Sequence, residues 1–328
     1  MTDKIRDLNT VKTMTAEVLE CSNHHRWRFG DAVTTLMRKV SLEYENQLES
    51  LLAVPYGRKM LNEFSSDLHD ALFAYLVSMQ WVGWGDCEFG PPLELPDDSG
   101  IYALSLIAYL GARLMDDAID HHLDYKGQFQ SFYGYLTEKS GRDQAAGISA
   151  AAGHFLITAS IRRMVKRGSL NTACSVMQLY NPVFAGALCE TGVNEIAITP
   201  GLYRSVIRHK AVAYDRILHV VFFRKAEPLV RERILSFLAT HSEYSQWLND
   251  LSDEADDRSR NQMSILKVTG MDRDKLINTI LKSFLELWNG AGDLHPDIRN
   301  VMAVRLNDSL KKLTRADGGG PGFPNDAG

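Results

Sequence analysis

The chain has 328 residues, of which 45% are hydrophobic and 23% charged, and its formal net charge at pH 7 is −5. This composition is typical of a globular protein with a large core, and the lack of a long basic run argues against nucleic acid as a partner. The sequence contains no uninterrupted run of about 18 or more apolar residues, so no membrane span is expected. The four cysteines lack Cys-x-x-Cys spacing and the N-terminus is charged, so we expect free thiols in a cytoplasmic protein.

Apolar residues recur at helical spacing from the first predicted element onward. Residues 41–54 read as an amphipathic helix that Pro55 ends, and residues 66–82 as an apolar, aromatic helix. A loop rich in proline and glycine covers 90–100. The helix predicted at 101–120 has apolar residues on every side, which indicates a buried central helix.

The remainder of the chain continues this helical pattern. Further helices are predicted at 144–166, 171–190, 200–223, 228–259, 273–290 and 296–312. We find no alternating strand pattern and no internal repeat. The prediction is one all-α domain over residues 1–315, followed by a disordered tail over 316–328 that is rich in glycine and proline.

A cluster of aspartates ends the helix predicted at 101–120. Asp116 and Asp120 are four residues apart and share one helix face, and Asp117 lies beside them. Carboxylates at a helix C-terminus oppose the helix dipole, so helix stability does not explain them. They are either ligands of a hard cation such as Mg²⁺ or a solvated helix end.

A second cluster lies in the helix predicted at 228–259. Asn249, Asp253 and Asp257 are spaced four and four, so they stack along one face. Alone, this pattern is also that of a solvated surface face. Two such clusters on separate helices suit two walls of one cavity, with Mg²⁺ ions joining both walls to a diphosphate. The two clusters together are a more specific signal of a metal site than either cluster alone.

At these residues the chain resembles the class I isoprenoid synthases, which include trans-prenyl diphosphate synthases and terpene cyclases. Asp116-Asp-Ala-Ile-Asp120 matches the family's DDxxD motif. Gln246-Trp-Leu-Asn-Asp-Leu-Ser-Asp253 resembles the second motif of the prenyl synthases, with Asn249 where Asp is usual. Asn249, Asp253 and Asp257 also fit the spacing of the metal-binding triad of cyclases, with Asp at the middle and last positions.

The resemblance implies a helical bundle around a central apolar cavity, a prenyl diphosphate substrate and three Mg²⁺ ions. It also implies a homodimer, because family members often form dimers. The residues that it assigns to the metal ions are Asp116, Asp117, Asp120, Asn249, Asp253 and Asp257.

Departures from the family pattern bear on the reaction. No Gly-Gly-Lys-Arg segment precedes the first motif, and His121-His-Leu-Asp-Tyr-Lys replaces the usual Arg pair after it. In chain-elongating members those cations hold isopentenyl diphosphate and the allylic partner. Their absence favours a cyclase that converts farnesyl diphosphate to a sesquiterpene hydrocarbon, similar to the humulene-type cyclases of fungal meroterpenoid pathways. The alternatives are a chain-elongating synthase and a non-catalytic helical scaffold.

Several cations are candidates for holding the diphosphate. Lys210 lies in a stripe of apolar and aromatic residues that includes Tyr214, so it either snorkels to the surface or meets a buried anion. The resemblance favours the anion, and it places an anion-sensing arginine near Arg204. The complete candidate set is Arg204, Arg208, Lys210, Arg258, Arg260 and Lys267.

Aromatic rings suit the wall of a site that forms a carbocation, because each ring face stabilises a nearby cation by ~0.5–2 kcal/mol. Ordinary core packing is the alternative for each of them. The candidates are Phe73, Trp81, Tyr109, Phe184, Trp247 and Trp288. Gly186, two residues after Phe184, suits a bend in its helix, a turn or close packing.

Overall fold

The computed structural model describes residues 13–14, 16–21, 38–52, 98–125, 129–192, 199–224, 228–259, 265–292 and 296–316. The chain divides into two compact units. Unit 1 comprises Met1–Arg28, Ile196–Tyr203 and Thr240–Gly328. Unit 2 comprises Phe29–Glu195 and Arg204–Ala239. The structure of each unit is described on its own.

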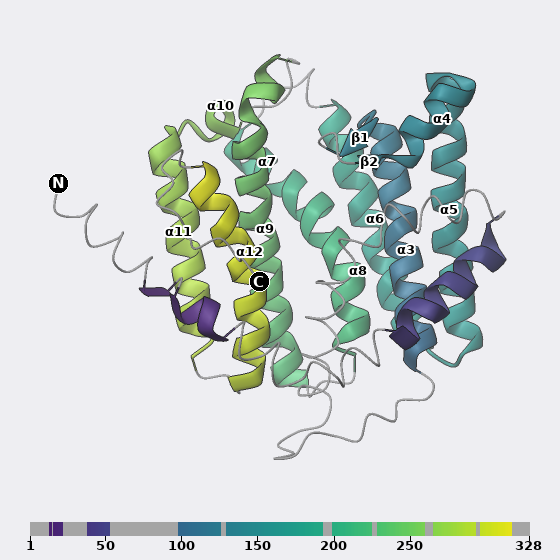
Figure 1. The fold of residues 1–328 in the computed structure, drawn as a ribbon, viewed down its shortest axis with the longest axis horizontal. Coiled ribbons are helices and arrows are strands. Elements are labelled where there is room, and N and C mark those ends of the chain that lie inside the picture. The colour runs from purple at the N-terminus through teal and green to yellow at the C-terminus, as the bar shows by residue number, and fades with distance from the viewer. Residues whose placement is uncertain are drawn as a thin grey trace, which may run out of the picture. The chain divides into compact units, whose positions relative to one another are not determined.

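Unit 2 is a bundle of helices around α3 (Figure 1). A helix over 38–51 precedes α3. Two helices are divided between the units: the last part of α7 and the first part of α9 belong to unit 2. The labelled elements of this part of the chain are α3 (Asp98–Ile119), β1 (Asp124–Tyr125), β2 (Phe129–Gln130), α4 (Phe132–Ser140), α5 (Arg142–Lys166), α6 (Leu170–Gly192), α7 (Pro200–Ile207), the π-helical turn η2 (Arg208–Val212), α8 (Ala213–Phe222) and α9 (Pro228–Ser259).

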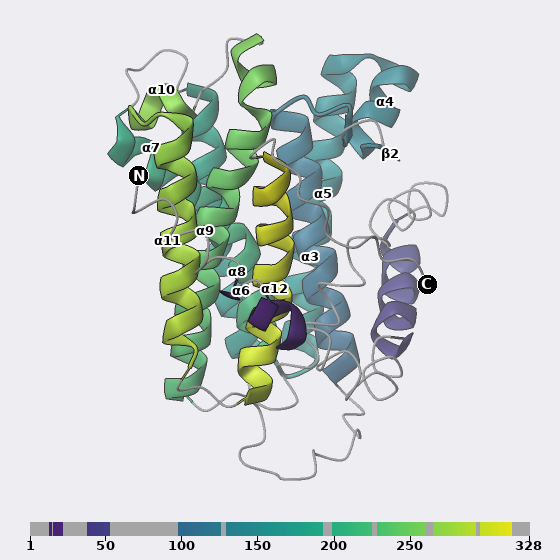
Figure 2. The same cartoon turned by 60° about the vertical axis from the view of Figure 1, so that its left-hand side comes forward.

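The helix α3 packs against α4, α5, α6 and α8. Leu104, Ile107 and Ala108 are completely buried, which agrees with a helix that is apolar on every side. Its backbone runs close to α5, because a Cβ atom at Gly111 would lie 2.6 Å from the carbonyl oxygen of Gly153. Figure 2 shows the two helices side by side.

The two-residue strands β1 and β2 form a small antiparallel pair after α3, with Asp124 opposite Gln130. Between the end of α3 and this pair, His121 has a positive φ of 55°. The Ser131 hydroxyl donates to the carbonyl of His122 and accepts from the N–H of Gly134, which begins α4. The chain after the first aspartate cluster is therefore held in a defined turn.

Unit 1 contains the second part of α9 together with α10 (Ile265–Thr269), α11 (Arg273–Gly290) and α12 (Pro296–Ala316). His241 of α9 is central to its packing. The His241 ring lies 5.8 Å from the ring of Phe284 on α11, and Nε2 lies 3.1 Å from the Ser309 hydroxyl on α12. Leu276, Ile280 and other apolar residues of these helices are also buried.

The all-α fold predicted from sequence is confirmed, although the pairing of β1 with β2 was not predicted. The helix predicted at 200–223 is interrupted by η2, and the short helices α4 and α10 were missed. The helix predicted at 66–82 lies outside the described residues, as does the predicted tail apart from Ala316, which ends α12. Among the described helices, none is both long and apolar enough to cross a membrane.

Candidate active site

Asp116, Asp120 and Lys210 form the central ion cluster of unit 2. The Lys210 ammonium lies 3.0 Å from Oδ1 of Asp116 and 2.7 Å from Oδ2 of Asp120. The three side chains are 22%, 19% and 19% exposed, respectively, so the cluster is shielded but reachable from solvent. The spacing of four along α3 places both carboxylates on one face, where they converge on a single cation.

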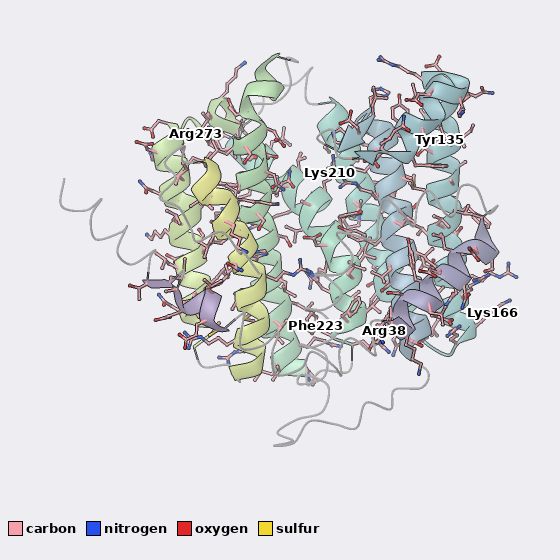
Figure 3. The ribbon with its side chains drawn as sticks, viewed as in Figure 1. Arg38, Tyr135, Lys166, Lys210, Phe223 and Arg273 are labelled. Atoms are coloured by element: carbon pink, nitrogen blue, oxygen red, sulfur yellow. The ribbon has the colours of Figure 1, made fainter. Side chains whose placement is uncertain are left out.

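Local backbone geometry brings Lys210 to this position. Lys210 is the central residue of η2, the π-helical turn that leads into α8 (Figure 3). A Cβ atom at Gly186 of α6 would lie 2.6 Å from the backbone nitrogen of Lys210 and 2.9 Å from the carbonyl carbon of His209. Only glycine permits this close approach, so Gly186 serves packing, one of the roles that the sequence suggested. Single π-helical turns of this kind are frequent at functional sites.

Aromatic side chains line the same side of α3. The rings of Tyr109 and Tyr214 lie 4.0 Å apart, and the Tyr214 hydroxyl donates to the Tyr109 carbonyl over 3.3 Å. Burial raises the pKa of Tyr214 well above its usual value. Tyr109 is two helical turns before Asp116, and Tyr214 is one turn after Lys210, so this pair lies next to the ion cluster along both helices.

A second aromatic pair comes from α6. The rings of Tyr180 and Phe184 lie 4.5 Å apart, and the Tyr180 hydroxyl contacts the sulfur of Met115 at 3.3 Å. Burial raises the pKa of Tyr180 to about 12, so its hydroxyl stays protonated at neutral pH. Two of the predicted wall residues, Tyr109 and Phe184, therefore lie in part-buried aromatic pairs of unit 2.

Asp117 has different surroundings from its two neighbours. Its side chain is 1% exposed, and Oδ1 lies 3.4 Å from Nε of Arg113 and 3.7 Å from Nδ1 of His122. The nearby Asp117 carboxylate raises the pKa of His122. These contacts tie the end of α3 to the turn that follows it, and the predicted role of Asp117 as a metal ligand stays a prediction.

The second cluster lies on α9 in unit 1. Oδ1 of Asn249 accepts from the Lys312 ammonium over 3.4 Å, and Asp253 is partly exposed. Asp250, next to Asn249, accepts from the Tyr203 hydroxyl, and over 2.7 Å from the amide of Gln246. The cluster therefore has partly exposed side-chain oxygens at Asn249 and Asp253, next to the Asp250 carboxylate, which Tyr203 and Gln246 hold in place.

The remaining predicted cations have varied positions. Arg204 and Arg208 are exposed at the junction of α7 and η2, and Lys267 is exposed on α10. Other predicted site residues have no described side chain. For Asp257 and Arg258 the described part is the backbone of α9, and Phe73, Trp81 and Arg260 lie outside the described residues.

The two predicted tryptophans lie in the packing of unit 1. The Trp247 ring is 8% exposed and lies 5.3 Å from the ring of Tyr244. Trp288 is 2% exposed, its indole N–H donates to Glu17 over 3.0 Å, and the Arg299 guanidinium lies 4.3 Å from its ring centroid. Trp288 thus has a clear structural role, and a contribution of either ring to a substrate pocket stays a prediction.

Comparison with solved structures identifies the fold. A polyprenyl synthase from Caulobacter crescentus, crystallised with calcium and isoprenyl diphosphate, superposes with a TM-score of 0.64 at 10% identity, over 88% of this chain and 97% of that one. A decaprenyl diphosphate synthase from Rhodobacter capsulatus gives 0.59 at 13% identity, over 92% and 94% of the two chains. A geranyltranstransferase from Thermotoga maritima gives 0.58 at 13% identity, over 85% and 98%.

This chain has the isoprenoid synthase fold. No family model matches its sequence, and no curated protein does either. The superpositions span most of this chain and nearly the whole of each solved structure. The resemblance seen in the aspartate motifs is therefore confirmed at the level of the fold.

The donor set of unit 2 fits the divalent cation implied by this fold. Asp116 and Asp120 offer hard oxygen ligands that already converge on one positive charge, the Lys210 ammonium. Among the described residues, no group of three His, Cys, Asp or Glu side chains is arranged to hold a metal ion. Two carboxylates are compatible with a hard divalent cation that retains waters and binds substrate phosphates, and the role of Asp116 and Asp120 as metal ligands stays a prediction.

Sequence reasoning missed two features of this site. The stripe of residues that contains Lys210 and Tyr214 keeps regular helical spacing, so it carries no signal of the π-helical turn. The buried position of Asp117 was also missed, because the composition around it resembles that around Asp116. The sequence held one signal of this difference: Arg113 lies four residues before Asp117, a spacing that favours an ion pair between the two side chains.

Proposed function

We propose that this protein is a magnesium-dependent class I terpene cyclase that ionises farnesyl diphosphate and cyclises the resulting allylic cation to a sesquiterpene hydrocarbon. The observation that carries the proposal is the convergence of Asp116, Asp120 and Lys210 at the end of the central helix α3. It joins the first aspartate motif to a cation suited to a diphosphate. The isoprenoid synthase fold supports the same chemistry.

In this proposal Asp116 and Asp120 would hold Mg²⁺, and Asn249, Asp253 and Asp257 of α9 are its further predicted ligands. Bound Mg²⁺ supplies Lewis-acid stabilisation of the leaving diphosphate. The C1–O bond breaks heterolytically, and both electrons leave with the diphosphate. Protein cations placed where this charge develops lower the barrier to ionisation, and Lys210 is the candidate with the best-defined position.

The part-buried aromatic pairs suit the later steps. The ring faces of Tyr109 and Phe184 stabilise positive charge on a hydrocarbon, and apolar walls keep water from quenching the cation. A distal double bond then attacks C1, and loss of a proton to a base, for which the diphosphate is a candidate, ends the reaction. The protonated hydroxyls of Tyr180 and Tyr214 add no negative charge to this wall.

A chain-elongating prenyl diphosphate synthase is the second candidate. Support for it comes from the solved structures that share this fold, which include a polyprenyl synthase and a decaprenyl diphosphate synthase. Against it, the residues after Asp120 are His121 and His122 rather than two arginines. His121 is hydrogen-bonded to the Tyr133 hydroxyl at 3.0 Å and His122 lies beside Asp117, so both contact protein groups at the position where elongating enzymes bind substrate.

Incubation with prenyl diphosphates tests the proposal. Purified protein is supplied with Mg²⁺ and either farnesyl or geranylgeranyl diphosphate, with and without isopentenyl diphosphate. Release of a cyclic hydrocarbon from farnesyl diphosphate alone, detected by gas chromatography and mass spectrometry, is the expected result. Formation of a longer diphosphate only when isopentenyl diphosphate is present would replace the cyclase by the synthase. No turnover of any substrate would reject both and leave the scaffold alternative.

A further inference from the structure

Lys210 occupies the position between two carboxylates that the proposed function assigns to a divalent cation. Its ammonium lies within 3.0 Å of Asp116 and within 2.7 Å of Asp120. The residue was predicted to contact the diphosphate, yet a carboxylate pair is its partner in this structure. The same cation therefore has an observed anionic partner, the carboxylate pair, and a predicted one, the diphosphate.

Charge balance shows why the two partners compete. Two carboxylates and one ammonium leave a net charge of −1, whereas the same carboxylates with a divalent cation are neutral. Two positive groups at one point repel strongly in a shielded site, and all three side chains are only about one fifth exposed. The ammonium must therefore leave its position when the carboxylates accept a divalent cation.

We propose that Lys210 is the counter-ion of Asp116 and Asp120 while no metal is bound, and that its ammonium moves to the diphosphate when a divalent cation binds these carboxylates. The inference rests on the proposed function. It makes Lys210 a coupling element: the lysine weakens metal binding when no diphosphate is present, and it strengthens diphosphate binding once the metal has released it. Metal and diphosphate then bind cooperatively, which disfavours a metal-loaded site without substrate.

The surroundings of Lys210 suit such a movement. The backbone of η2 packs closely against Gly186 of α6, which fixes the backbone position of Lys210. The Lys210 side chain, in contrast, has four rotatable bonds. Arg208, two residues earlier, is exposed. A released ammonium thus stays tethered close to the two carboxylates.

Binding of Mn²⁺, followed by the loss of its free electron paramagnetic resonance signal, tests the inference without any catalytic assay. Lys210→Met is compared with wild type and with Lys166→Met, a matched change at an exposed lysine of α5, labelled with Lys210 in Figure 3. We expect Lys210→Met to bind Mn²⁺ alone about 5- to 20-fold more tightly than either reference, and to lose most of the increase in affinity that inorganic pyrophosphate produces. An affinity for Mn²⁺ alone that is equal to or weaker than that of the references would overturn the inference.

A second measurement uses the wild-type protein and needs no variant to fold. Lysines are acetylated briefly with an amine-reactive ester, and modification of Lys210 relative to Lys166 is quantified by mass spectrometry. Mg²⁺ alone is expected to raise the labelling of Lys210 by releasing it, and addition of pyrophosphate is expected to lower it again. Labelling that Mg²⁺ leaves unchanged would contradict the movement.

The two proposals fail in different ways. If the protein makes a hydrocarbon but Mn²⁺ affinity does not respond to Lys210→Met, the cyclase proposal stands and the counter-ion inference is rejected. If Mn²⁺ and pyrophosphate bind cooperatively through Lys210 but no prenyl diphosphate is consumed, the inference stands and the cyclase is rejected. Wild-type protein that binds no Mn²⁺, with or without pyrophosphate, rejects both.

Discussion

Asp116 and Asp117 are adjacent in sequence, and the structure separates their roles. Asp116 is 22% exposed and bound to the Lys210 ammonium, whereas Asp117 is 1% exposed beside Arg113 and His122. A helix turns by about 100° per residue, so neighbouring side chains point to different faces. The four-residue spacing of Asp116 and Asp120 is therefore more informative than the Asp-Asp doublet.

Substitution by asparagine is expected to distinguish these two aspartates. Asp116→Asn should lower turnover by about 10²–10³-fold, because it weakens the electrostatic stabilisation of the leaving group, with little change in the free energy of unfolding. Asp117→Asn should instead lower that free energy by about 1–3 kcal/mol, since it removes a buried charge from its partners. Initial rates and denaturant unfolding measure the two effects. If both variants lost turnover equally and kept the stability of wild type, Asp117 would be a metal ligand.

A pH-dependent stability is expected from His241. Burial and the nearby Arg305 lower the pKa of its ring to about 3. In the unfolded chain the ring titrates near pH 6.5, so unfolding takes up a proton between these two pH values, and stability falls as the pH decreases below about 6.5. At pH 5 the loss from this one group is about 2 kcal/mol, at roughly 1.4 kcal/mol per pH unit.

Urea unfolding between pH 8 and pH 5 measures this effect. His241→Asn should show a smaller decrease in stability over that range than wild type, whatever its stability at pH 8. His154→Asn, at an exposed position of α5, is the control and should behave as wild type. Parallel pH profiles for wild type and His241→Asn would show that His241 is not the group responsible.

At the scale of elements, the contact between α6 and η2 positions Lys210. The three atoms nearest to a Cβ atom at Gly186 are all backbone atoms, the nearest at 2.6 Å, and these cannot rotate away as a side chain can. The regular spacing of apolar residues around Lys210 predicted one helix over 200–223. The structure instead has α7, a π-helical turn and α8, because this close approach is a tertiary contact that residue spacing does not record.

Gly186→Ala and Gly147→Ala are expected to have opposite effects. Gly186→Ala should lower the free energy of unfolding by about 1–3 kcal/mol, because the backbone of η2 must shift, and it should weaken pyrophosphate binding by displacing Lys210. At Gly147 of α5 an added Cβ would have no atom within 4 Å apart from its chain neighbours and the backbone of its own helix. Alanine there should raise stability by about 0.5–1 kcal/mol through helix propensity alone. Thermal and urea unfolding measure both, and a neutral Gly186→Ala would show that α6 and η2 are less closely packed.

The element boundaries show what periodicity predicts well. The helix predicted at 144–166 is observed as α5, Arg142–Lys166, and that predicted at 273–290 as α11, Arg273–Gly290. Long amphipathic helices carry their signal over many turns. The short helix α4 was missed because nine residues span less than three turns, too few to establish a period.

At the scale of the whole molecule, ligand binding should stabilise the folded protein. Mg²⁺ and pyrophosphate together, at about 100 times their dissociation constant, should raise the free energy of unfolding by about 2.7 kcal/mol and Tm by several degrees. Scanning calorimetry with each component alone and with both measures this. In wild type we expect the stabilisation by Mg²⁺ and pyrophosphate together to exceed the sum of the stabilisations by each alone. In Asp116→Asn we expect the stabilisation by the two together to vanish. Simple additivity would argue against a shared site.

The sequence alone determined that this protein is all-helical, and that Asp116 and Asp120 lie on one face of its central helix, because helical periodicity is a local property of the chain. Only the tertiary structure brought Lys210, 90 residues from Asp120 in the chain, within 2.7 Å of its carboxylate. The same is true of the burial of Asp117 beside Arg113 and His122. Contacts of this kind depend on how closely two backbones approach and on the register of a turn, and neither quantity is recorded in the spacing of residues.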